Sequence, residues 1–209
     1  MSYVPEFVAL YEIVPYIEYL ALNNESIRVA IKDYIEGGKK KDTIIKKYGP
    51  IGDWNTSSVT LLMSAFEGAR DFNQSISNWD TSNVTHFTYL FLGAVSFDQP
   101  IGDWNVSSLT DMFYMFKDAT SFNQSIRNWD VSQVTTMTNI FIYTTSLSNI
   151  NKGLIHESFS SNSNWSYDWR EFVALDNTNF QTAVNLWFDN QAEANATYGH
   201  ISDWNTSAV

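Results

Sequence analysis

The chain has 209 residues, enough for one domain or for one repeat array with its end caps. Its formal net charge of −11 argues against a nucleic-acid partner, because binding a phosphate backbone requires a basic surface. Cysteine is absent, which excludes disulfides and cysteine-based zinc sites, and no uncharged apolar run is long enough to span a membrane.

The N-terminal segment is apolar, but it carries three glutamates and lacks the basic start of a secretory signal. We interpret residues 1–48 as a helical cap, because the exposed end of a repeat array needs an amphipathic cover. The absence of a visible signal peptide favours an intracellular or virion location over secretion.

A repeat of 25 residues follows this cap. Its period is marked by four tryptophans, and a fifth lies three further periods along the chain: Trp54, Trp79, Trp104, Trp129 and Trp204. Self-similarity at a fixed period of this length is the signature of stacked repeat architectures. The spacing predicts four repeats over residues 49–148 and a partial repeat over residues 201–209.

Each repeat is predicted to contain one short strand and one short helix. Apolar and small polar residues alternate between Phe72 and Ile76, as in a strand with one buried face. Apolar residues then follow at a three-four-three spacing from Val59, with Ser57 ahead of them as a helix cap. Such units bury a core only by stacking, so we predict an α/β fold: a right-handed solenoid with a helical N-terminal cap.

The repeat resembles that of BspA-type surface proteins, a leucine-rich-repeat-like family. The resemblance rests on the string W-D/N-x-S-x-V/L-T-x-M-x-x-M-F-x-x-A-x-x-F-N-Q, which runs here from Trp104 to Gln124. It implies a scaffold of bacterial surfaces, algae, protists and large DNA viruses, with structural or adhesive roles and no known catalysis. By the same resemblance, residues 149–200 end one array and open the next with a second cap-like helix.

No residues are assigned to catalysis, to a cofactor or to a metal. The aspartates beside the tryptophans recur with the repeat, which favours roles in turns over paired catalytic carboxylates: Asp53, Asp80, Asp103, Asp130 and Asp203. The three histidines are scattered, and no glycine-rich phosphate loop precedes a helix. Two alternatives stay open: calcium held by the Asp/Asn turns, and an active site in the irregular segment around Trp165, Asp168 and Arg170.

The candidate partner-binding residues belong to two groups. Tyr89 and Tyr114 share one repeat position that lies off the apolar face, and exposed tyrosines at matched positions suit a binding ridge. Polar residues on the predicted strand side line the face that solenoids use for partners: Asn73, Asp98, Asn123 and Arg127.

The expected function is therefore that of a non-enzymatic repeat scaffold, and the resemblance adds the expectation of a component of a large DNA virus particle. Its partner would be another protein or a second copy, with residues 201–209 as a candidate contact. The alternative is an adhesion or ligand-binding module that recognises a protein through the strand face. Neither reading involves nucleic acid, a membrane span or a cofactor.

Overall fold

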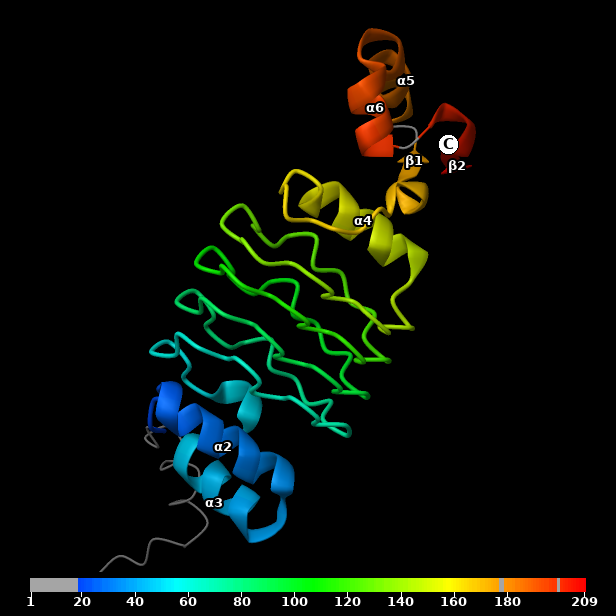
Figure 1. Ribbon diagram of the computed structural model, residues 1–209. Helices are drawn as coiled ribbons and strands as arrows, with labels where there is room; N and C mark the ends of the chain where they lie inside the picture. Colours follow the sequence, from blue (N-terminus) through cyan, green and yellow to red (C-terminus); the bar gives the residue numbers. More distant parts are fainter. Residues whose placement is uncertain (1–18, 177–178, 199) are drawn as a thin grey trace, which may run out of the picture.

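A computed structural model describes residues 19–176, 179–198 and 200–209 (Figure 1). Helices lie at both ends of the described chain, and four 25-residue units lie side by side in sequence order between them. Among the described residues there are few helices and almost no regular strands, and one large core of aromatic and aliphatic side chains is buried at the centre. The first 18 residues of the predicted cap lie outside the described residues.

Two helices, α2 (Asn24–Glu36) and α3 (Gly38–Tyr48), pack at the start of the first unit. The side chain of Asn23 caps α2 by accepting hydrogen bonds from two amides of its first turn. The apolar face of α2 is buried, and on it the ring of Tyr34 meets the indole of Trp54 edge-on at 5.8 Å. A short 3-10 helix, η2 (Ile51–Asp53), leads into the unit. The helical segment therefore covers the first tryptophan of the array.

The backbone of each unit alternates between two kinds of hydrogen bond. In unit 1 (residues 49–73), the amide of Ala65 donates to Leu62 of the same unit at 3.1 Å. The amides of Ser64 and Phe66 donate instead to Thr88 and Leu90 of the next unit, both at 3.0 Å. The same alternation recurs in units 2 (74–98) and 3 (99–123), so each unit is tied to the next by its backbone. Unit 4 spans residues 124–148.

The strand and helix predicted for each unit are wrong. The stretch from Phe72 to Ile76 is not a strand, and the parallel bridges lie instead in the segment predicted as helical, where Leu61 pairs with His86. That segment is a run of turns because Ser64 adopts a φ of 57° and every second amide points to the neighbouring unit, which prevents the i to i−4 bonds of a helix. The left-handed conformation recurs at the equivalent residues: Tyr89, Tyr114 and Asn139.

Equivalent phenylalanines stack on one another from unit to unit. One column has ring centroids 5.4 to 5.6 Å apart: Phe66, Phe91, Phe116 and Phe141. A second has spacings of 6.0 and 6.2 Å: Phe72, Phe97 and Phe122. Burial of such a ring contributes roughly 4–6 kcal/mol before entropy is subtracted. These columns therefore contribute to the stability of the central units.

The tryptophans join the units through hydrogen bonds as well as through packing. Each indole N–H donates to the isoleucine carbonyl of the preceding unit, at 2.7, 3.1 and 3.0 Å. The donors are Trp79, Trp104 and Trp129, and the acceptors are Ile51, Ile76 and Ile101. Since a buried indole needs an acceptor, these bonds satisfy the tryptophans. The acceptor is a backbone carbonyl that any residue could supply, and the isoleucines themselves are buried in the core.

The end of unit 4 is covered by α4 (Asn149–Phe159) and by the segment that follows it. Three aromatic rings surround the last phenylalanine of the first column, Phe141: Trp165, Tyr167 and Trp169, with centroids 6.5, 5.9 and 5.4 Å away. The Tyr167 hydroxyl accepts a hydrogen bond from the Phe141 amide at 2.8 Å. These side chains take the place that a further unit occupies elsewhere in the array.

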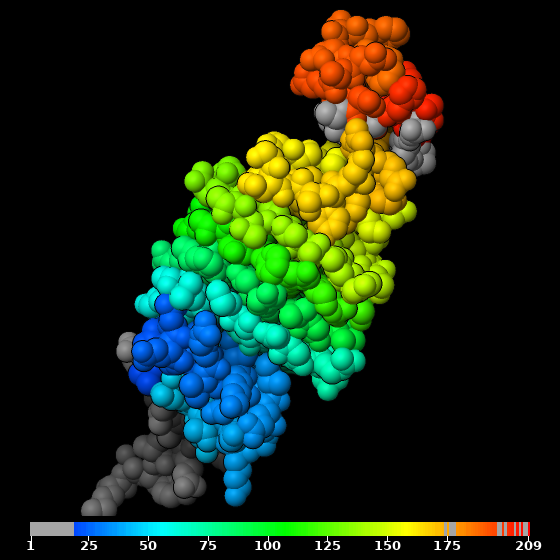
Figure 2. Space-filling view, in the orientation of Figure 1, coloured from blue at the N-terminus to red at the C-terminus, as the bar shows by residue number. Residues whose placement is uncertain are grey.

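Beyond a short 3-10 helix, η3 (Arg170–Phe172), the described parts of residues 174–209 form a small C-terminal unit at the far end of the molecule (Figure 2). It contains two strands that pair in parallel, two helices and one 3-10 helix. They are β1 (Ala174–Asp176), α5 (Phe180–Asp189), α6 (Gln191–Tyr198), η4 (Ile201–Asp203) and β2 (Asn205–Ala208).

Candidate partner-binding surfaces

The two tyrosines predicted to bind a partner lie together on the surface of units 2 and 3. The rings of Tyr89 and Tyr114 are stacked with centroids 6.0 Å apart, and the ring of Phe113 meets Tyr89 edge-on at 5.5 Å. All three side chains are half-buried. We call this set the aromatic ridge. The ammonium of Lys117 lies 5.9 Å from the centre of the Tyr114 ring and is paired with the carboxylate of Asp118.

The conformation of the ridge residues is unusual. Tyr89 and Tyr114 have φ values of 57° and 53°, in the left-handed region that residues with a β-carbon rarely occupy. The equivalent residues in units 1 and 4 are Ser64 and Asn139. Asparagine tolerates this conformation better than tyrosine, so the two tyrosines adopt it at a local cost to stability.

The polar residues predicted to bind a partner form a ladder between units. The Asn73 side-chain oxygen accepts from the Asp98 amide at 3.0 Å, and Asp98 Oδ1 accepts from the Asn123 amide at 2.9 Å. Asn123 Oδ1 in turn accepts from the amide of Ser148 at 2.9 Å. Arg127 is exposed and stands outside this ladder. The structure thus brings three of these residues together in inter-unit bonds, and their binding of a partner stays a prediction.

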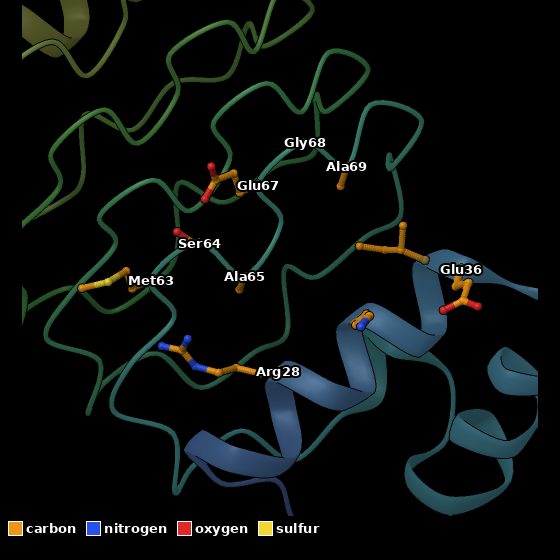
Figure 3. Close-up of a pocket in the computed structure, with 10 residues that line it drawn as sticks. Arg28, Glu36, Met63, Ser64, Ala65, Glu67, Gly68 and Ala69 are labelled. Atoms are coloured by element: carbon orange, nitrogen blue, oxygen red, sulfur yellow. The ribbon is translucent and has the colours of Figure 1, made fainter.

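A groove that the sequence did not suggest lies between α2 and unit 1 (Figure 3). It encloses a cavity of about 470 Å³. Four side chains of α2 form one wall: Arg28, Lys32, Ile35 and Glu36. Residues 63–65 and 67–69 of unit 1 form the other. The two walls are more than 25 residues apart in the chain, so no local motif in the sequence marks the groove.

The C-terminal unit repeats the arrangement at the start of the array. Tyr34 and Tyr48 pack their rings against Trp54 at 5.8 and 6.2 Å. In the C-terminal unit, Trp187 and Tyr198 pack against Trp204 at 6.0 and 6.1 Å. The strand pairings also correspond, because the parallel bridge between Asn23 and Ser58 has its counterpart in the pairing of Asp176 with Ala208.

The two arrangements differ in burial, because a 25-residue unit packs over the first and the described residues provide none for the second. Ile51 and Val59 are 3% and 0% exposed because unit 2 packs over them, as the Trp79 indole bonded to Ile51 shows. Their counterparts in the C-terminal unit, Ile201 and Val209, are 40% and 50% exposed. The C-terminal unit therefore presents apolar surface that the same geometry buries under a 25-residue unit elsewhere in the molecule.

Residues 39–153, more than half of the chain, match a sequence family described as Mycoplasma protein of unknown function, DUF285. The chain belongs to the DUF285 family. This is a BspA-like, leucine-rich-repeat-like repeat family, so the family resemblance drawn from the repeat is confirmed at that level. No curated protein and no solved structure matches the chain.

The matched region of this DUF285 member contains all but the first residue of α3 and the four units, including four of the five aspartates that the sequence placed in turns. Asp80 accepts hydrogen bonds from the amide and the hydroxyl of Ser82, and these bonds lower the pKa of its carboxyl group. Asp130 is held by Ser132 in the same way. Among the described residues, no group of three or more His, Asp or Glu side chains could hold a metal ion.

The irregular segment proposed as an alternative active site includes a buried histidine, His156, among its described residues. The Trp165 indole donates to His156 Nδ1 at 2.9 Å, and burial lowers the pKa of the imidazole. Burial likewise raises the pKa of Tyr167 to about 12. Asp168 pairs with Arg170, and both are more exposed than the histidine.

None of the described helices combines the length and hydropathy of a membrane span.

Proposed function

We propose that the protein is a non-enzymatic scaffold whose stacked units form a leucine-rich-repeat-like solenoid and which acts through protein–protein contacts in a structural or assembly role. Support for the solenoid comes from the bonds between successive units and from the phenylalanine columns. Membership of a BspA-like repeat family agrees with this reading. A place in a viral particle stays a prediction of the repeat resemblance.

The observation that carries the assembly role is the uncovered apolar surface of the C-terminal unit. Ile201 and Val209 are far more exposed than their buried counterparts Ile51 and Val59. An apolar surface that another copy of the same geometry buries completely is a candidate contact for a protein partner or for a second copy of the chain. We assign the assembly contact to this surface.

Light scattering across a concentration series tests this assignment. The full chain is expected to self-associate as its concentration rises, and a variant lacking residues 201–209 is expected to stay monomeric. Ile201→Asp should act like the deletion, because it places a charge in the apolar surface. Ile150→Asp is the matched control, since Ile150 is 75% exposed on α4, away from this surface. If the full chain remains monomeric throughout, the contact with a second copy is wrong.

The alternative function is recognition of another protein through the aromatic ridge. The specific observation in its favour is that Tyr89 and Tyr114 are stacked and strained where other units carry serine and asparagine. The double variant Tyr89→Ser, Tyr114→Asn replaces them with the residues that units 1 and 4 carry at the same position. A partner bound through the ridge should be lost with this variant while the thermal stability is kept or raised. A partner that still binds the variant uses another surface.

A further inference from the structure

The groove between α2 and unit 1 is lined by an open backbone edge. At each of the three interfaces between units, four alternate amides of one unit donate to four alternate carbonyls of the next. The acceptors in unit 2, for example, are His86, Thr88, Leu90 and Leu92. The counterparts of these carbonyls in unit 1 belong to residues 61, 63, 65 and 67. Within the described chain, no amide or side chain donates to any of these four carbonyls.

The cap replaces only part of the hydrogen bonds that a preceding unit would make with unit 1. In units 2 to 4 a threonine amide donates to the carbonyl of the equivalent threonine in the preceding unit, as the Thr85 amide does to the Thr60 carbonyl. In unit 1 the amides of Thr60 and Leu61 donate instead to the side-chain oxygen of Asn24. Asn24 thus replaces an acceptor of a preceding unit, and the Leu22 amide replaces one donor by bonding to the Asn55 carbonyl, but no described residue donates to the carbonyls of residues 61, 63, 65 and 67. Carbonyls spaced in this way are the acceptors that an added strand uses.

The side chains of the groove indicate what kind of segment fits. Ile35 and Met63 are 41% and 37% exposed and offer apolar contacts on the two walls. Arg28 and Lys32 lie one turn apart on α2, and neither forms an ion pair within the described residues. The acidic residue of the same wall, Glu36, is already paired with Lys40 at 2.7 Å. Arg28 and Lys32 therefore place two positive charges beside the open carbonyls, with Glu36 next to Lys32 on the same wall and Glu67 on the other.

We propose that this groove binds an acidic peptide segment of a partner protein in an extended conformation. Alternate amides of the segment donate to the carbonyls of Met63, Ala65 and Glu67. Its apolar side chains contact Ile35 and Met63, and its carboxylates face Arg28 and Lys32. This surface lies at the opposite end of the array from the C-terminal unit, so the proposal does not depend on the assembly contact.

The probe for this site is a fluorescein-labelled peptide of sequence EVEVEVE with blocked ends, titrated against the full chain by fluorescence anisotropy. The double variant Arg28→Glu, Lys32→Glu should weaken binding by about tenfold or more, as expected for the reversal of two charges in contact. Lys39→Glu with Lys46→Glu is the matched control, because it makes the same charge change on α3 outside the groove. Equal weakening by both variants would reduce the effect to general electrostatics and overturn the proposal.

N-methylated peptides test the backbone contacts separately from charge. One peptide carries N-methyl groups on its valines and another on its glutamates, so that each lacks one of the two sets of alternate amides. The peptide that loses the inward-facing set should lose binding, and the carbonyl ¹³C shifts of Met63, Ala65 and Glu67 should move only with a binding peptide. Binding of both methylated peptides, or no binding of the parent at millimolar concentration, would show that the open edge is not a peptide site.

Discussion

The indole nitrogen of Trp104 lies 3.1 Å from the carbonyl oxygen of Ile76, which belongs to the preceding unit. The bond is buried, and the indole ring stacks on Trp129 of the following unit at 6.4 Å. One side chain therefore connects three successive units, by a hydrogen bond on one side and by ring stacking on the other.

Trp104→Phe should lower the free energy of unfolding by roughly 2–3 kcal/mol, because the smaller ring leaves a void and the Ile76 carbonyl loses its donor. Urea denaturation followed by circular dichroism measures the change. Phe188→Leu serves as the control for aromatic loss, since Phe188 is 81% exposed, and it should change stability by less than about 0.5 kcal/mol. Similar effects of the two changes would contradict the structural role of the bond.

Variants of Asp98 separate the hydrogen-bonding role of its side chain in the inter-unit ladder from the role of its negative charge. Its Oδ1 accepts from the Asn123 amide and from the Gln124 side chain at 2.7 Å. Asp98→Ala should cost about 1–3 kcal/mol, because it leaves these donors without their acceptor. Asp98→Asn keeps an oxygen in the same place and should be nearly neutral. Thermal denaturation of the two variants compares them, and a large loss with asparagine would mean that the negative charge itself is required.

Substitutions of Gly68 measure how much stability the left-handed turn conformation costs a residue with a side chain. Its φ is 69°, and a β-carbon built on it would meet nothing within 4 Å, so a substitution there changes the conformational preference without a clash. Gly68→Ala should therefore destabilise the protein by about 1 kcal/mol, and Gly68→Asn by less, since asparagine tolerates this region. Denaturant titration gives both values. A neutral Gly68→Ala would indicate that the backbone of unit 1 relaxes away from the left-handed turn.

His156 should make the stability depend on pH. Burial lowers its folded-state pKa below the unfolded value, with Arg170 acting in the same direction and Asp168 opposing it. The folded state then binds fewer protons, so the stability contributed by the neutral imidazole is complete above about pH 6.5 and falls as the pH drops below it. The free energy of unfolding changes through this group by at most about 1.4 kcal/mol per pH unit.

The difference between the wild type and His156→Gln isolates this effect. Glutamine still offers the Trp165 indole an acceptor but does not titrate. The other histidines, His86 and His200, are present in both proteins and cancel in the comparison. Urea denaturation at pH 7.5 and at pH 5 should show a larger loss of stability for the wild type. Parallel losses in both proteins would mean that His156 titrates normally.

The sequence predicted the period and the buried residues, because hydrophobic spacing reports which side chains face the core. Val59, Leu62 and Phe66 are all buried as that spacing requires. It did not predict the backbone, because a three-four-three spacing is shared by a helix and by these turns. The usual signal of a left-handed turn is glycine or asparagine, and Ser64 and Tyr89 occupy it here.

The arrangement of the candidate partner-binding surfaces could be predicted only in part, because it depends on this backbone conformation. Asn73 was placed on a strand face open to partners, but its side chain bonds to the next unit, and only the three-dimensional stacking reveals this. The tyrosines of the ridge were predicted from their matched spacing, and their stacking at 6.0 Å agrees with that spacing. The open carbonyls of unit 1 had no sequence signal, because a backbone acceptor leaves no residue type to recognise.

The hydrogen bonds between units run along the stack, which determines how the molecule responds to tension. A force applied between α2 and α4 pulls directly on these bonds, so they break a few at a time instead of being loaded together in shear. Each unit released adds 25 residues of extended chain, roughly 80–90 Å. Stretching should therefore proceed in equal steps of that length, and the array would act as an extensible spring under load.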